Sequence, residues 1–256
     1  MLLQPLPAFA DNYIWTLRES PAGAPLVVDP GDAAPVLAMA EATGLAPGAL
    51  LLTHHHPDHV GGAAALLRRW PGLPVFAPVD DRIEVPCQRV GHGDTVEAGP
   101  WRFEVLSVPG HTLSHIAFHG HGLLFCGDTL FSLGCGRLFE GTPSQMLASL
   151  DRLAALPPGT RVCCGHEYTL ANTNFAAAVD PGNATLQRRT REARALRERG
   201  APTLPALLAD ELAANPFLRV DAPEVRAAVG ARLGRAPVDR IETFAELRQW
   251  KDGFVA

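Results

Sequence analysis

Short apolar runs separated by turn residues dominate the first two thirds of the chain, and this pattern is typical of buried strands. We predict strands at Ile14–Leu17, Leu26–Val28, Leu50–Thr53, Val75–Ala77, Phe103–Val108, Ile116–Phe118, Leu123–Cys126 and Val162–Cys164. Apolar residues at helical spacing predict helices at Pro35–Thr43, Val60–Trp70 and Met146–Leu156, the last introduced by Thr142-Pro143. Helices mixed with many strands indicate a layered α/β fold.

The pattern becomes helical after about residue 170. We predict helices over residues 183–199, Leu204–Ala214, Pro223–Leu233 and Val238–Asp252. In the last helix, Val238, Ile241 and Ala245 lie on one stripe. We therefore predict a catalytic α/β domain of residues 1–170 and a small helical domain of residues 171–256.

Composition places the chain among ordinary globular proteins, with 47% hydrophobic and 19% charged residues in a length of 256. The net charge of −5 gives no reason to expect a nucleic-acid partner. No apolar run is long enough to span a membrane. Residues 1–170 hold 9 basic and 16 acidic residues, whereas residues 171–256 hold 13 and 11. The more basic tail favours docking of an anionic small molecule.

The cysteines and the N-terminus both favour a cytoplasmic protein. Five cysteines without regular spacing do not resemble a disulfide framework, so reduced thiols are the simpler interpretation. The first five residues, Met1 to Pro5, lack the basic and apolar pattern of a secretory leader.

One segment carries most of the chemical information, because residues 53–59 read Thr-His-His-His-Pro-Asp-His after a predicted strand. In extended backbone, side chains two residues apart point the same way, so His54 and His56 can hold one cation while His55 faces the other side. A turn at Pro57 directs Asp58 and His59 towards a second ion. Imidazole and carboxylate together suit zinc, iron or manganese.

Three more ligand-type residues each follow a predicted strand and a glycine: His111, Asp128 and His166. A lone histidine in such a place is usually an ordinary surface or core residue, and an aspartate alone is explained by a turn. Their shared placement with the 53–59 segment favours one metal centre at one edge of a sheet. We do not expect the remaining histidines to be ligands, although His115 should be buried nearby: His55, His92, His115, His119 and His121.

The series Thr-His-x-His-x-Asp-His, Gly-His-Thr, Gly-Asp-Thr and Gly-His-Glu-Tyr resembles the motifs of the metallo-β-lactamase superfamily. Within it, the chain is most similar to the glyoxalase II family of hydroxyacylglutathione hydrolases. The resemblance runs from Asp11-Asn12-Tyr13 to the last predicted helix. Residues 131–142 resemble the family's substrate loop, and residues 248–252 resemble a segment near its C-terminus. The resemblance implies a four-layer αβ/βα sandwich with a small C-terminal helical domain.

The resemblance also implies two divalent metal ions, with zinc expected and iron or manganese as alternatives. It assigns His54, His56 and His111 to one ion, Asp58, His59 and His166 to the other, and Asp128 to both. Asp58 and Asp128 are the expected catalytic residues. The implied glutathione contacts are Arg137, Phe139, Tyr168, Arg248 and Lys251. Many relatives carry Tyr at Phe139, and relatives commonly carry Gly at Ser114.

The implied activity is hydrolysis of S-(2-hydroxyacyl)glutathione thioesters, chiefly S-D-lactoylglutathione, by a hydroxide that bridges the ions, in the degradation of methylglyoxal. We expect a monomer with no nucleic-acid or membrane partner. One alternative is a glutathione persulfide dioxygenase of the same superfamily, which would use one iron and consume oxygen. Another is a non-catalytic binding protein on this scaffold, which we disfavour because all seven ligand positions are filled.

Overall fold

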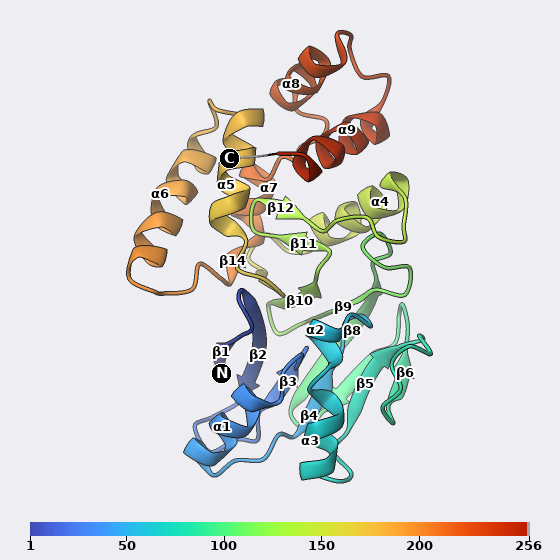
Figure 1. Cartoon of the computed structure of the whole chain (residues 1–256), viewed down its shortest axis with the longest axis vertical. Helices are drawn as coiled ribbons and strands as arrows, with labels where there is room; N and C mark the ends of the chain where they lie inside the picture. Colours follow the sequence, from blue (N-terminus) through green and yellow to red (C-terminus); the bar gives the residue numbers. More distant parts are fainter. Residues whose placement is uncertain (255–256) are drawn as a thin grey trace. The chain divides into compact units, whose positions relative to one another are not determined.

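The apolar runs of the first ninety residues pair into a six-stranded sheet, in a computed structural model that describes residues 1–254 (Figure 1). Its strand order follows the sequence: β1 (Leu2–Ala8), β2 (Asn12–Arg18), β3 (Leu26–Val28), β4 (Ala49–Leu51), β5 (Val75–Pro78) and β6 (Gln88–Val90). The first three strands pair antiparallel, and β3 to β6 pair parallel.

Parallel pairing requires crossover connections, and helices supply two of the three. Helix α1 (Ala34–Thr43) links β3 to β4, and α2 (Pro57–Val60) with α3 (Ala63–Arg69) links β4 to β5. Val36 of α1 and Leu66 of α3 belong to one buried apolar cluster with Val27 and Leu50 of the sheet. The parallel strands thus end at the same edge, which brings the segments after β3, β4 and β5 together.

A second six-stranded sheet has the order β14-β13-β10-β9-β8-β7. Its strands are β7 (Thr95–Ala98), β8 (Trp101–Ser107), β9 (Ile116–Gly120), β10 (Leu123–Gly127), β13 (Arg161–Cys164) and β14 (Ala206–Leu207). The indole nitrogen of Trp15 in β2 donates to the carbonyl of Cys164 in β13 at 2.9 Å, linking this sheet to the first. Strands β11 (Leu130–Phe131) and β12 (Gly134–Cys135) form a separate hairpin.

Contacts divide the chain into two compact units. Unit 1 comprises residues 1–107, 114–127 and 163–166, and unit 2 comprises residues 108–113, 128–162 and those from 167 onward. The helices of unit 2 are α4 (Pro143–Ala154), α5 (Thr169–Val179), α6 (Ala184–Glu198), α7 (Leu208–Ala214), α8 (Pro223–Leu233) and α9 (Arg240–Asp252).

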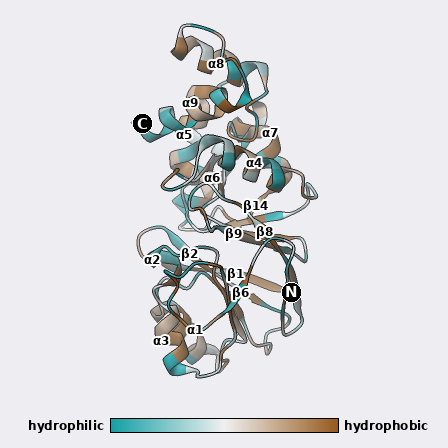
Figure 2. Cartoon of the chain, turned by 90° about the vertical axis from the view of Figure 1, so that its right-hand side faces the viewer, coloured by the Kyte–Doolittle hydropathy of each residue, from teal (hydrophilic) through white to brown (hydrophobic). Residues whose placement is uncertain are grey.

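In unit 2, Phe217 lies between α7 and α8 and packs against rings of α5 and α9, and α4 begins at a defined cap. The ring of Phe217 lies 5.8 Å from that of Phe175 and 5.9 Å from that of Phe244. Helix α4 begins at a capping box in which Thr142 and Gln145 satisfy each other's backbone N–H groups. Polar and apolar residues both occur along α9 (Figure 2). Within residues 1–254, no helix combines the length and apolarity needed to cross a membrane.

The α/β class and the helical C-terminal region are confirmed, and all eight predicted strands exist, Leu26–Val28 with its predicted bounds and the other seven with shifted ends. The helix predicted at Val60–Trp70 is wrong in its bounds, because it begins at Pro57 and is interrupted at Gly61-Gly62. A β-carbon at Gly62 would lie 2.5 Å from the carbonyl oxygen of Pro30, so the chain passes too close to the turn after β3 for a larger residue. The sequence did not predict six strands and one helix: β1, β6, β7, β11, β12, β14 and α5.

Two C-terminal predictions also need correction. The helix predicted at Leu204–Ala214 begins only at Leu208, because Ala206 and Leu207 pair with β13. The stripe predicted on the last helix is not its buried face, since Val238 is 76% exposed and Ile241 is 41% exposed. Asp239 caps α9 instead, and the buried residues of the helix are Thr243, Phe244, Leu247 and Arg248.

Candidate metal centre

The segment that leaves β4 brings two imidazoles together at ligand spacing. His54 Nε2 lies 3.1 Å from His56 Nδ1. Two nitrogens bound tetrahedrally to zinc at about 2.0–2.1 Å would be about 3.4 Å apart, so both rings can bind one cation. His55 is directed elsewhere, with Nδ1 3.4 Å from Asp80 Oδ2.

Helix α2 positions a second set of ligand atoms in unit 1. Asp58 Oδ2 lies 3.5 Å from His59 Nε2 and 3.4 Å from His166 Nε2. All three ligand atoms lie within 4.8 Å of one another, as three corners of a tetrahedral site would. Pro57 begins α2, so Asp58 lies in its first turn and His59 follows immediately. The helix begins three residues earlier than predicted, and the change of direction at Pro57 occurs as expected.

Each of four candidate histidines has Nδ1 in contact with an oxygen. The partners are Asp29 Oδ2 for His59 (3.0 Å), Asp11 Oδ1 for His166 (2.7 Å), the Arg137 carbonyl for His111 (2.9 Å) and Thr53 Oγ1 for His54 (3.1 Å). A carboxylate or carbonyl at Nδ1 holds the proton there and leaves the Nε2 lone pair for a cation. This is how metal-binding histidines are oriented, so the donor set fits divalent ions.

Asp29 supports His59 directly and His54 through Thr53, and no sequence pattern predicts this role. It follows β3, its backbone has φ of 51°, and its carboxylate accepts from Thr53 N (2.8 Å), Thr53 Oγ1 (2.7 Å) and His59 Nδ1. Because the Thr53 hydroxyl donates to Asp29, it accepts from His54 Nδ1. The available signal was the strand-end position of Asp29-Pro30-Gly31, which matches that of the predicted ligands.

The hairpin between β1 and β2 supplies further support that the residue pattern did not reveal. Asn12 Nδ2 donates to Asp58 Oδ2 at 3.0 Å, and Asp11 contacts His166. Asn12 also forms an isolated bridge with His166. In the sequence, Asp11-Asn12-Tyr13 marks only the start of the family resemblance. His115, expected to be buried nearby, is fully buried and stacks on His54 with ring centroids 4.5 Å apart.

Unit 2 contains the other two candidate ligands. His111 Nε2 lies 3.5 Å from Asp128 Oδ2, and both residues are buried. Glycine is required beside them, because a β-carbon at Gly136 would lie 1.9 Å from the carbonyl oxygen of Asp128. This pair has the spacing of two ligands of one ion.

The candidate substrate-binding cations also lie in unit 2. Arg248 is 5% exposed and donates to the Cys135 carbonyl at 2.7 Å and to Asp252 at 3.0 Å. Lys251 Nζ donates to the Ala171 carbonyl at 3.1 Å. Burial, with smaller effects of the Arg248 and Arg137 charges, lowers the pKa of Lys251 to about 8. Arg137 is largely exposed, with Nε 3.6 Å from Asp252.

The two aromatic candidates differ in exposure. The Tyr168 ring lies against Phe131, with centroids 5.2 Å apart. Phe139 is 64% exposed, and its ring lies 5.2 Å from that of His111. An exposed aromatic ring beside a candidate ligand is available to contact a bound substrate.

Comparison with known proteins identifies the family of this chain. The model of the metallo-beta-lactamase superfamily matches residues 13–75 and 72–166, and the model described as hydroxyacylglutathione hydrolase C-terminus matches residues 167–254. A hydroxyacylglutathione hydrolase of Xylella fastidiosa (strain M23) is 59% identical over 254 residues, covering 99% of this chain and 98% of the relative. The chain belongs to the hydroxyacylglutathione hydrolase family. Another member, from Xanthomonas axonopodis pv. citri (strain 306), is 58% identical over 256 residues and is matched over its whole length.

Solved structures show the same fold beyond the hydroxyacylglutathione hydrolase family. The BLEG-1 B3 metallo-β-lactamase matches with a TM-score of 0.65 and 22% identity, covering 85% of this chain and 99% of that one. ETHE1 from Myxococcus xanthus matches with a TM-score of 0.65 and 24% identity, covering 99% of this chain and 91% of that one. The fold is therefore the metallo-β-lactamase fold, and its His/Asp cluster is suited to divalent metal ions.

Proposed function

We propose that this chain hydrolyses S-(2-hydroxyacyl)glutathione thioesters, chiefly S-D-lactoylglutathione, to glutathione and a 2-hydroxy acid. The supporting observation is its similarity, at 59% identity over nearly the full length of both chains, to a protein named hydroxyacylglutathione hydrolase. The filled ligand positions agree with a working enzyme rather than with a binding protein derived from one.

Two divalent ions are proposed, with zinc as the expected metal. His54, His56 and His111 would hold one ion, Asp58, His59 and His166 would hold the other, and Asp128 would bind both. When bound, such a pair lowers the pKa of a shared water to about 7 and polarises the thioester carbonyl. Iron is the main alternative, since a protein 34% identical over 65% of this chain was solved in a di-iron-bound form with a TM-score of 0.55.

The chain's own residues orient the reaction. Asn12 Nδ2 holds the Asp58 carboxylate, which would accept a hydrogen bond from the attacking water or hydroxide. Asp11 and Asp29 keep protons on the Nδ1 atoms of His166 and His59, so these rings present lone pairs at Nε2.

The glutathione carboxylates would be held by cationic side chains of unit 2. We assign direct contacts to Arg137 and Lys251, with the Tyr168 and Phe139 rings beside the peptide part of glutathione. Arg248 is already bound to the Cys135 carbonyl and Asp252, so we assign it a role in holding Lys251 and the β11–β12 hairpin in place. In this scheme, residues 1–170 carry the chemistry together with Arg137, Phe139 and Tyr168, and the proposed substrate-binding domain of residues 171–256 contributes Lys251 and its neighbour Arg248.

The test is turnover of S-D-lactoylglutathione by metal-loaded protein, with metal content measured on the same sample. Asp128→Ala should reduce kcat by several orders of magnitude, while Asp81→Ala, at an exposed aspartate, should leave it unchanged. Equal turnover by both variants would contradict the assignment of Asp128. Oxygen consumption with glutathione persulfide, in place of thioester hydrolysis, would favour the dioxygenase alternative.

We further propose a monomer located in the cytoplasm, without a nucleic-acid partner. The irregularly spaced cysteines support the cytoplasmic location. The acidic net charge argues against a nucleic-acid partner. Light scattering during size-exclusion chromatography would test the oligomeric state, and a mass near 27.3 kDa is expected.

A further inference from the structure

Two buried carboxylates flank the histidine segment in unit 1. Strands β3, β4 and β5 are parallel and end at the same edge of their sheet. Asp29 follows β3, the histidines follow β4, and Asp80 follows β5. Asp80 is only 8% exposed and was not identified by the sequence pattern. Its position mirrors that of Asp29 on the opposite side of the segment.

Asp80 is held by Arg82 and ionised. Arg82 donates from Nε to Oδ1 and from a terminal nitrogen to Oδ2, both at 2.8 Å, and its backbone N–H donates to Oδ1 at 3.0 Å. The Arg82 side chain, against the opposing effect of burial and with help from the Ser114 hydroxyl, holds the pKa of Asp80 far below its usual range. The carboxylate is therefore a fixed negative charge near the histidines.

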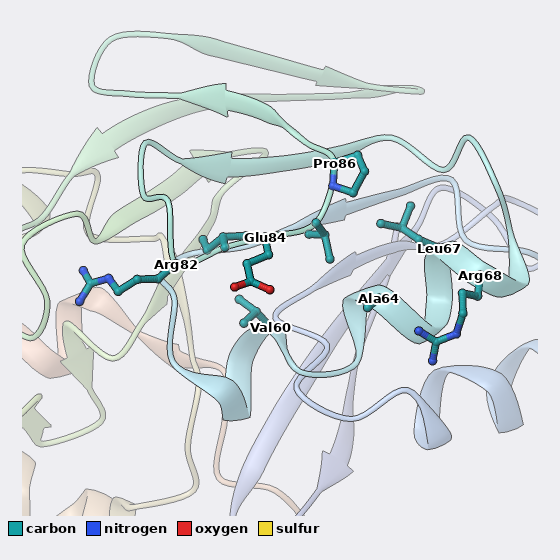
Figure 3. Close-up of a pocket in the computed structure, with 9 residues that line it drawn as sticks. Val60, Ala64, Leu67, Arg68, Arg82, Glu84 and Pro86 are labelled. Atoms are coloured by element: carbon teal, nitrogen blue, oxygen red, sulfur yellow. The ribbon is translucent and has the colours of Figure 1, made fainter.

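Arg82 also lines a neighbouring cavity of 580 Å³, but its guanidinium does not serve that cavity. Figure 3 shows the Arg82 side chain extending away from the cavity, whereas Val60 and Glu84 lie towards one another across it. Arg82 thus binds both carboxylate oxygens of Asp80. The lining of the cavity is mainly apolar and does not identify a ligand that would bind there.

Two further contacts of Asp80 lead towards the candidate ligands. On one side, His55 Nδ1 lies 3.4 Å from Asp80 Oδ2, and His55 stands between His54 and His56 in the chain. On the other side, the Ser114 hydroxyl donates to Asp80 Oδ2 at 2.5 Å.

Ser114 is followed by His115, whose ring stacks on that of His54 with a 17° angle between planes. Backbone pairing joins the same two segments, because Ile116 N–H donates to the Thr53 carbonyl at 3.0 Å. Asp80 therefore ties together both segments that contact the His54 ring.

We propose that Asp80 is a positioning residue for the cation site of His54 and His56, acting through His55 on one side and Ser114 on the other. This inference rests on the proposed metal-binding role of those two histidines. It assigns a function to the middle histidine of the His-His-His run, which holds the segment in place instead of binding an ion. It also assigns a function to Ser114, because its hydroxyl donates to Asp80.

The test measures metal affinity directly in the full-length chain. Metal is removed with a chelator, and Zn²⁺ binding is then followed by competition with a chromophoric chelator, together with the visible spectrum after Co²⁺ loading. Asp80→Asn should weaken one of two Zn²⁺ equivalents about 10–100-fold, as losses of supporting partners do, and should change the Co²⁺ spectrum. Ser114→Ala should give a smaller loss in the same direction. Asp81→Asn is the matched control, because it removes the same charge from an exposed neighbour.

The outcomes separate this inference from the proposed function. If Asp80→Asn lowers the unfolding temperature but the folded variant and Ser114→Ala both bind Zn²⁺ as the wild type does, Asp80 is merely structural and the inference fails. If Asp80→Asn does not fold, Ser114→Ala alone decides, and wild-type affinity in it overturns the inference. If the wild-type protein itself binds no Zn²⁺ or Co²⁺, the proposed metal centre fails first.

Discussion

Asp29 offers a direct way to test the tautomer argument. Asn is the suitable replacement because it has nearly the same shape and tolerates the left-handed backbone found at this residue, where φ is 51°. Two hydrogen bonds from Thr53 and one from His59 end on the carboxylate, which is 4% exposed. An amide has only one acceptor oxygen, so one of the two carboxylate oxygens is replaced by an NH₂ group, which cannot accept a hydrogen bond.

The best placement keeps the Asn oxygen on the Thr53 backbone N–H, which leaves the amide nitrogen facing the Thr53 hydroxyl and His59 Nδ1. The hydroxyl can rotate to accept, but the imidazole can accept only by moving its proton to Nε2. Hydrogen bonds to charged groups contribute about 1.5–3 kcal/mol each, so we expect Asp29→Asn to lower the free energy of unfolding by about 3 kcal/mol. For a chain of this length, that corresponds to roughly 6–12 °C in Tm.

A proton on His59 Nε2 also removes the lone pair that would bind a cation. Asp29→Asn should therefore weaken the site of Asp58, His59 and His166 about 10–100-fold. Thermal unfolding of metal-free protein measures the first effect, and chelator competition with Zn²⁺ measures the second. Asp32→Asn is the control, because its side chain accepts from Ala34 N–H near the start of α1 and Asn makes the same contact. Wild-type Zn²⁺ affinity in a folded Asp29→Asn protein would refute the tautomer argument.

Three other predictions follow from the same contacts. With a Lys251 pKa of about 8, the ammonium loses its charge as pH rises from 7 to 9, so KM for S-D-lactoylglutathione should rise over this range. Lys251→Gln should show a raised KM that does not change with pH, and a wild-type profile in this variant would exclude Lys251 from binding. Removal of metal with a chelator should abolish turnover and lower Tm, because ions that bind only the native state stabilise it, by about 4 kcal/mol at 1,000 times Kd; Zn²⁺ should restore both. Gly31→Ala places a β-carbon 1.8 Å from the Asp58 carbonyl oxygen and should cost about 1–3 kcal/mol in unfolding measurements. Gly91→Ala, with no atom within 4 Å, should cost far less, and equal losses would show that crowding at Gly31 is not the cause.

The sequence predicted the parts of the site that depend on local pattern. A buried strand followed by a ligand-type residue is a local signal, and it placed the 53–59 segment, His111, Asp128 and His166 at strand ends as the structure has them. The direction change at Pro57 is likewise local, since proline begins a helix readily.

The supporting contacts could not be predicted because they join residues that are distant in the chain. Asp29 lies 30 positions from His59, and the residue pattern between them does not predict that the two side chains meet. Arg248 shows the same limit, because a charged residue near the C-terminus suggests a solvated surface until Cys135 is placed beside it. Strand β1 was missed because its prolines, Pro5 and Pro7, argue against a strand, although they are tolerated at the edge of a sheet.

The contact between Asp11 and His166 spans 155 positions, and it has a consequence for biosynthesis. A nascent chain on the ribosome carries Asp58 and His59 long before His166 has been translated. Until then, the β1–β2 hairpin has no imidazole to orient, and an ion meeting the growing polypeptide finds an incomplete set of side chains. In the proposed centre, the site of Asp58, His59 and His166 would therefore be complete only after nearly two-thirds of the chain has been synthesised.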